Sequence, residues 1–233
     1  MSQISKILCV LSVILMMGVT VHADSQNTYK LLLDQYRLST SNYNLWSGVE
    51  VGAFVAANWY DLDYSEPGSP PGYDRSPSID GYTGGLLLGY NHQSANMVYG
   101  IEADLGMVQL SEDIDGNSAN NYSAFEVDWN AHIRAKIGKA INSTMLYIAG
   151  GVAIAGVNLS DNDPGWGEDD ATHVGWTAGI GAEYAMNNEL RVRLEYLYDD
   201  YGDETYSISG PYTYYSNIDL SAAIVRVCLS LQF

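Results

Sequence analysis

The chain has little cysteine, few basic residues and few long apolar runs, and each shortage excludes a class of protein. Only Cys228 lies beyond the first apolar run, so no disulfide can form within the remainder of the chain. Ten Lys and Arg stand against 28 Asp and Glu, and the net charge of -18 argues against nucleic-acid binding. Beyond that first run, no stretch approaches the ~20 apolar residues that a membrane-spanning helix needs.

The N-terminal residues have the pattern of an export signal. Lys6 precedes an apolar run over residues 7–21, and small residues occupy the expected cleavage positions up to Ala23. The run is shorter than a membrane-spanning helix of ~20 residues. We therefore expect the following division of the chain: a signal peptide at 1–23, a periplasmic lead-in at 24–45 and a folded β domain at 46–233.

The most regular pattern in the chain runs from Phe125 to Gly138. Apolar residues there alternate with residues that are almost all ionisable or polar. An extended chain places alternate residues on opposite faces, whereas a helix with a period of 3.6 would mix them. The segment is longer than the ~5–6 residues of an ordinary strand. Because a tilted strand needs ~9–11 residues to cross a bilayer, the pattern predicts a membrane-spanning strand.

The same alternation recurs along the rest of the chain, and no charged residue falls on any of the apolar faces. The segment at 145–157 is the weakest, because both of its faces are apolar or small. The sequence therefore predicts an all-β fold, an eight-stranded antiparallel transmembrane β-barrel. Its strands are expected at residues 48–60, 82–91, 97–108, 125–138, 145–157, 173–184, 190–199 and 218–233.

Short and long connections alternate between these strands. The short ones are residues 92–96, 139–143 and 185–188, and the long ones are 61–80, 109–121, 159–172 and 200–217. All six prolines fall in the long connections, as expected for a residue that cannot donate to a strand ladder. Short periplasmic turns and four long extracellular loops are typical of outer-membrane barrels.

The polar faces contain charges of both signs, which would be enclosed if the apolar faces meet lipid. An eight-stranded barrel is just wide enough for side chains to fill it. Two hypotheses follow, a lumen plugged by ion pairs and a narrow ion pathway. A soluble β-barrel, with its apolar face inside and its charges in water, is the main rival. The predicted lumen charge network consists of Glu50, Glu102, Asp104, Glu126, Asp128, His132, Arg134, Lys136, Glu183, Arg191, Arg193, Glu195 and Arg226.

Aromatic residues gather near the predicted strand ends. Two aromatic girdles are what a bilayer interface favours, because these rings have an apolar body and most have a polar tip. We expect a periplasmic girdle of Trp46, Tyr90, Tyr99, Tyr184 and Phe233. We expect an outer girdle of Trp59, Tyr82, Phe125, Trp176 and Tyr198.

Several ordered blocks resemble a known family. They are Trp46–Gly52, Gly84–Asn91, Tyr99–Asp104, Tyr147–Ala153, Gly175–Tyr184 and Glu195–Tyr198. Together they resemble the OmpA-like outer-membrane β-barrel family, and most closely its porin-like surface antigens of alphaproteobacteria. The resemblance implies eight strands, location in the bacterial outer membrane and surface-exposed loops. It does not imply one biochemical activity.

The C-terminal residues alternate to the end of the chain, with Val227, Leu229, Leu231 and Phe233 on the apolar face. In the family such a strand is similar to the signal read by the barrel-assembly machinery, where strand addition would give affinity. Outer-membrane lipid is the second expected partner. A host or envelope partner of the extracellular loops is the third, because exposed Tyr, Ser and Gly suit adaptable binding.

The expected role is that of a structural or surface-antigen protein with a charge-plugged lumen. A narrow porin is the first alternative. A lipid-modifying enzyme is the second, with His173 as a base beside Asp169 and Asp170, but no nucleophile motif accompanies it. Acidic loops would suit Ca²⁺, yet their spacing does not fit an EF-hand. No catalytic residue, metal or cofactor is predicted.

Overall fold

A computed structural model of the chain describes residues 45–65, 76, 78–115, 122–161, 167–209 and 213–233. This part of the chain contains no helix that is long and apolar enough to cross a membrane. The expected signal peptide, nearly all of the lead-in and the six prolines lie outside the described residues. The strands are β1 (Gly48–Ser65), β2 (Ser78–Ser94), β3 (Met97–Gln109), β4 (Ser111–Asp115), β5 (Tyr122–Ile141), β6 (Thr144–Asp161), β7 (Glu168–Ala185), β8 (Leu190–Ser209) and β9 (Thr213–Gln232).

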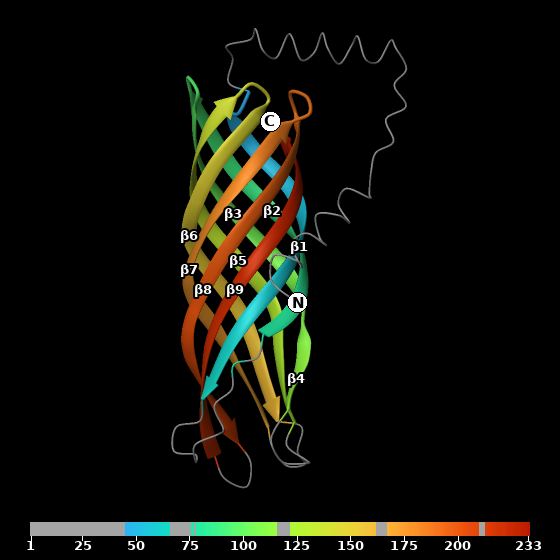
Figure 1. Cartoon of the computed structure of the whole chain (residues 1–233), viewed down its shortest axis with the longest axis vertical. Helices are drawn as coiled ribbons and strands as arrows, with labels where there is room; N and C mark the ends of the chain where they lie inside the picture. Colours follow the sequence, from blue (N-terminus) through green and yellow to red (C-terminus); the bar gives the residue numbers. More distant parts are fainter. Residues whose placement is uncertain (1–44, 66–75, 77, 116–121, 162–166, 210–212) are drawn as a thin grey trace, which may run out of the picture.

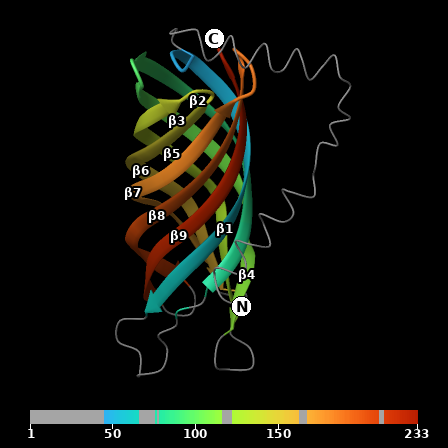
Figure 2. The same cartoon turned by 45° about the horizontal axis from the view of Figure 1, so that its top comes forward.

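The strands form one antiparallel sheet that closes on itself (Figures 1 and 2). Strand β1 pairs with both β2 and β9, and β3 pairs with β5 to complete the closure. Strand β4 continues β3 past Leu110 and also pairs with β5. Because β3 and β4 occupy one strand position, the nine segments make eight barrel strands. The predicted eight-stranded barrel is confirmed.

Apolar and polar residues that alternate along a strand lie on opposite sides of the barrel wall, with the apolar ones outside and the polar ones in the lumen. Ile133 is 63% exposed on the outer wall, whereas its neighbour Arg134 is 2% exposed within the lumen. The same holds for Ile101 beside Glu102. A soluble barrel would place these side chains the other way round, so the soluble alternative is wrong. An apolar outer wall is what hydrocarbon requires, because a charge at mid-membrane costs ~2–4 kcal/mol.

Three tight turns join strands at the end where the chain terminates, at the top of Figure 1. Ala95 and Asn142 adopt left-handed φ angles of 53° and 56° in two of them. At the other end the strands run further than predicted. Strands β8 and β9 pair as far as Ser209 and Thr213, so most of the predicted loop at 200–217 is a hairpin. The prediction placed strand ends too early because it took Tyr- and Ser-rich segments for loops, although tyrosine is a good strand former.

The lumen is filled in three layers. The periplasmic apolar cluster consists of Trp46, Val98, Met145, Tyr147 and Ala185. A charged layer follows, and the extracellular apolar cluster lies on its other side. That cluster includes Tyr60, Leu62, Ile79, Phe125, Val127, Val157, Leu159, Tyr201, Tyr206, Ile218 and Leu220.

Candidate functional site: the charged layer of the lumen

Arg193 lies at the centre of the charged layer and uses its whole guanidinium group. Its Nη2 lies 2.7 Å from Glu50 Oε1 and its Nη1 lies 2.6 Å from Glu102 Oε2. Its Nε lies 3.0 Å from Glu183 Oε2. Arg193 lies on β8, and strands β1, β3 and β7 each place one of these carboxylates beside its guanidinium group. The side chain is fully buried, so each of these bonds is charge-assisted and shielded from water.

Arg134 and Arg226 form the next level. Arg134 pairs with Glu102, with Asp104 at 3.0 Å and with Glu195 at 3.0 Å. Arg226 pairs with Glu195, with Asp104 at 3.0 Å and with Glu102 at 3.3 Å. The two arginines share all three carboxylates, so no acid in this level depends on a single partner.

His132 joins the charged layer to the extracellular apolar cluster. Its Nδ1 lies 2.7 Å from Asp104 Oδ1 and its Nε2 lies 2.9 Å from Asp199 Oδ2. Tyr201 also donates its hydroxyl to Asp199 Oδ2, at 2.9 Å. A neutral imidazole has one N–H, whereas two carboxylate partners require two donors. The geometry therefore assigns the imidazolium form to His132.

The buried charges of the described lumen balance when His132 is charged. The carboxylates are Glu50, Glu102, Asp104, Glu183, Glu195 and Asp199. The cations are His132, Arg134, Lys136, Arg191, Arg193 and Arg226. A neutral enclosed network avoids the cost of an uncompensated buried charge.

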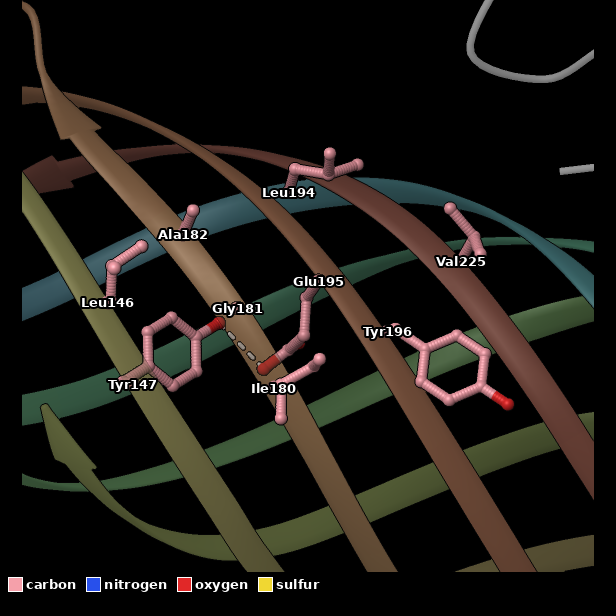
Figure 3. A pocket seen from close by; sticks show the side chains of 9 residues that line it. All are labelled: Leu146, Tyr147, Ile180, Gly181, Ala182, Leu194, Glu195, Tyr196 and Val225. Atoms are coloured by element: carbon pink, nitrogen blue, oxygen red, sulfur yellow. Dashed lines mark hydrogen bonds between the residues drawn. The ribbon is translucent and has the colours of Figure 1, made fainter. Parts of the chain in front are cut away.

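The Tyr147 side chain passes over Gly181 on the inner wall and joins the network at Glu195. These two residues are cross-strand partners on β6 and β7, and Glu195 is the partner of Gly181 on β8. The Tyr147 hydroxyl donates to Glu195 Oε1 at 2.7 Å, as the dashed line in Figure 3 marks. The ring can cross β7 because Gly181 has no Cβ to obstruct it.

Most of the predicted network residues meet in this layer. Gathered there are Glu50, Glu102, Asp104, His132, Arg134, Lys136, Glu183, Arg193, Glu195 and Arg226. Arg191 is buried too, but it lies in the periplasmic cluster, 5.1 Å from the Trp46 ring, and donates to backbone carbonyls. The prediction left out Asp199, although this residue lies on the polar face of its predicted strand, and also Ser230 and Asn91, which donate to Glu50.

Two predicted network residues do not face the lumen. Asp128 is exposed and has no partner in the β5–β6 register, which shifts between Val127 and Trp129. This β-bulge inserts one residue and reverses the faces beyond it. Glu126 therefore leaves the lumen, whereas Phe125 and Val127 enter it and are buried. The prediction for all four residues was wrong for this one reason.

The aromatic girdles are partly as expected. Exposed on the outer wall are Tyr82, Tyr90, Tyr99, Trp176, Tyr184, Tyr198 and Phe233. Trp46 instead closes the periplasmic end of the lumen, where its backbone N–H donates to Gln93 Oε1. Phe125 is inside because of the bulge. Trp59 is only 4% exposed and lies between Asp61 and its partner Asp80, at a level where the wall becomes acidic.

The C-terminal strand completes the barrel to its last residue. Phe233 exchanges two backbone hydrogen bonds with Val49, at 3.1 and 2.8 Å. Leu229, Leu231 and Phe233 face outward, and Val227 is half-buried on the same face. Their use as an insertion signal stays a prediction.

His173 lies inside the extracellular end of the barrel. It is fully buried, and its Nε2 lies 2.8 Å from the Tyr206 hydroxyl. Burial lowers its pKa below the ordinary value, although the carboxylate of Glu204 partly opposes this. Over the described ranges, no group of three or more His, Cys, Asp or Glu side chains is arranged to hold a metal.

Comparison with known proteins gives a consistent result. The model of a family described as "Outer membrane protein beta-barrel domain" matches residues 12–233. The 22 kDa outer membrane protein of Rhizobium leguminosarum is 34% identical over 163 residues, covering 70% of this chain and 68% of the relative. The 25 kDa outer-membrane immunogenic protein of Brucella abortus is 29% identical over 165 residues, covering 71% and 70%. The 31 kDa immunogenic protein of Brucella melitensis is 33% identical over 174 residues, covering 67% and 72%.

A solved structure supports the fold independently. The outer membrane protein OprG from Pseudomonas aeruginosa superimposes with a TM-score of 0.54 at 15% identity, covering 80% of this chain and 96% of that one.

The relatives confirm the resemblance to alphaproteobacterial surface antigens. All three are named as outer-membrane proteins, and none of the three is named as an enzyme.

Proposed function

The chain belongs to the outer-membrane protein β-barrel family, and from this premise we propose that it is a surface antigen whose own side chains close its lumen. It is an integral protein of the bacterial outer membrane. The observation on which the proposal depends is the charged layer between two apolar clusters.

A closed lumen follows from how the layers fit together. Every carboxylate of the charged layer lies against one or more cations, and the buried charges of the described lumen as a whole balance. Trp46 and Met145 are fully buried on its periplasmic side, and Phe125 and Leu220 are fully buried on its extracellular side. An ion would need to part an apolar cluster, cross the ion pairs and part a second cluster. This arrangement favours a plug over the narrow porin.

Conductance in planar lipid bilayers tests the closed lumen. The refolded protein, with its fold verified by heat-modifiable electrophoretic mobility, should give no discrete current steps. A water-filled porin inserted in parallel is the positive control. Reproducible steps from the folded wild-type protein would overturn the plug and favour the porin.

The surface role is supported by the relatives and by the extracellular wall. Two of the relatives reported above are named immunogenic. Strands β8 and β9 extend beyond the outer girdle and expose Glu204 and Tyr215 there. Antibodies against the purified protein should bind intact cells, and external protease should cleave the long connections. Binding only after the cells are lysed would contradict surface exposure.

The proposal assigns no catalytic role to the chain. His173, the residue of the enzyme hypothesis, is buried and engaged with Tyr206. A His173→Ala variant should leave lipid A unaltered relative to the wild type. The proposal does include the assembly machinery as a partner, because Leu229, Leu231 and Phe233 present one apolar face on the closing strand.

A further inference from the structure

The outer wall is hollowed on one side. A groove of about 470 Å³ crosses β6, β7, β8 and β9. Figure 3 shows the side chains that line it. Its apolar lining consists of Leu146, Ile180, Ala182, Leu194, Tyr196 and Val225. Gly181 lies at its floor, with Tyr147 and Glu195 behind it on the lumen side.

The hollow arises from residue size along the register. Ala182 lies between two larger cross-strand partners, Leu146 on β6 and Leu194 on β8. Both leucines protrude from the wall, whereas the alanine has only a methyl group. A small residue between two large ones lowers the wall between two ridges, since side chains of a sheet stand perpendicular to it. The valley forms here because the low region continues to Val225 on β9.

The valley continues toward β9. Val225 faces outward, yet it is only 7% exposed, and its cross-strand partner Tyr196 stands beside it. The floor is fixed from within, because the Tyr147 ring lies over Gly181 and is held by Glu195. The groove is therefore a fixed feature of the wall that spans four strands.

The height of the groove between the two aromatic girdles shows which part of the bilayer surrounds it. On β7, Tyr184 belongs to the periplasmic girdle and Trp176 to the outer girdle, and Ala182 lies between them, closer to Tyr184. The groove thus opens into hydrocarbon in the periplasmic half of the bilayer, and its lining is continuous with the lipid-facing wall.

We propose that this groove binds one acyl chain of a phospholipid from the periplasmic leaflet and retains it as a resident lipid. A flexible linear chain can lie in the valley between the Leu146 and Leu194 ridges and bury apolar surface along it. A second copy of the barrel would contact the ridges of Leu146 and Leu194 first and leave the valley unfilled.

Two variants of matched chemistry test the proposal. Ala182→Phe places a ring in the valley. Ala103→Phe is the control, because Ala103 also lies outward between two large partners, Leu88 and Ile133, but does not line the groove. Should Ala182→Phe fail the heat-modifiability check for folding, Ala182→Leu fills the same space with less bulk.

The readout is phospholipid retained by the full chain. Each protein is reconstituted into vesicles of phosphatidylethanolamine and phosphatidylglycerol, purified in mild detergent and examined by native mass spectrometry. The wild type and Ala103→Phe should each retain one phospholipid, and Ala182→Phe should lose this retained phospholipid several-fold.

Three results would overturn the proposal. The first is a wild-type protein that retains no phospholipid, and the second is equal retention by Ala182→Phe and Ala103→Phe. The third is a dimer that forms a cross-link through Leu194→Cys in a Cys228→Ser background. The last would place a second copy over the groove. Each result is independent of the conductance and surface-exposure experiments.

Discussion

Tyr147 and Gly181 are cross-strand partners, and the tyrosine ring occupies the space where a Cβ of residue 181 would stand. The ring continues across β7, and its hydroxyl reaches Glu195 on β8 at 2.7 Å. One glycine therefore connects the floor of the outer groove to the ion pairs of the lumen.

Gly181→Ala should destabilise the barrel by about 1–3 kcal/mol, as expected for overpacking a filled interior. The added methyl group would overlap the Tyr147 ring and displace its hydroxyl from Glu195. Equilibrium unfolding in urea with lipid vesicles measures the effect. Gly84→Ala is the control, because a Cβ there meets nothing within 4 Å. Equal stability of the two variants would contradict the account.

Arg193→Met should be among the most damaging lumen substitutions. It removes the closer of the two cations that Glu50, Glu102 and Glu183 share, the other being Lys136 at 3.3–3.8 Å. Removing one partner of a buried ion pair costs about 3–5 kcal/mol. Lys139→Met is the control, because Lys139 is exposed at the periplasmic end of β5. The same urea unfolding experiment compares them. A loss no larger than that of the control would show that the network does not stabilise the fold.

Much of this architecture was predictable because the barrel converts a simple alternation into inside and outside. Arg134 and Ile133 could be assigned to opposite faces from their spacing alone, since one face must meet hydrocarbon and cannot tolerate charge. The same rule placed Arg193 and Glu195 together in the lumen before any distance was known.

The bulge and the apolar residues of the lumen could not be predicted, because the alternation of apolar and polar residues does not distinguish them. Phe125, Val127 and Trp129 form an unbroken apolar series in the sequence, so a bulge that inserts Asp128 leaves no mark in the pattern. The extracellular apolar cluster was equally hidden. Residues such as Leu220 and Ile218 are apolar, and an apolar residue is compatible with either the lumen or the lipid.

The bulge can be tested by labelling single cysteines in a Cys228→Ser background, since native Cys228 is buried. Asp128→Cys should react quickly with a membrane-impermeant maleimide, because Asp128 is exposed near the extracellular end of β5. Val127→Cys should react slowly, because Val127 lies inside the barrel. The ratio of the two labelling rates on intact cells is the measurement. The reverse order would restore the unbroken strand of the sequence prediction.

Asp219 should make stability depend weakly on pH. Partial desolvation and the carboxylates of Asp200, Asp63 and Asp203 raise its pKa above the ordinary 3.8. The folded state therefore binds this proton more tightly than the unfolded state, and the resulting stability is lost as pH rises through the raised pKa.

Asp219→Asn should therefore stabilise the barrel at neutral pH and have no effect at a pH below the ordinary value. The gain should not exceed about 0.5 kcal/mol, because the group is exposed and screened by solvent. Added salt should reduce it further. Unfolding free energies across this pH range check the prediction, with the exposed Asp128→Asn as control. A destabilised variant at neutral pH would reverse the sign.

His132 should carry protons on both ring nitrogens at neutral pH, because each nitrogen faces a carboxylate, Asp104 on one side and Asp199 on the other. Selective ¹⁵N-histidine NMR of the folded protein distinguishes a protonated from an unprotonated ring nitrogen, and a His132→Gln variant assigns the signals. His173 is the internal control, since burial lowers its pKa and it should remain neutral. A neutral His132 would leave one carboxylate facing a nitrogen lone pair and the lumen with one uncompensated negative charge. That result would require the ion-pair assignment around Asp199 to be abandoned, whereas two protonated nitrogens would establish the histidine as the sixth cation of a balanced, closed lumen.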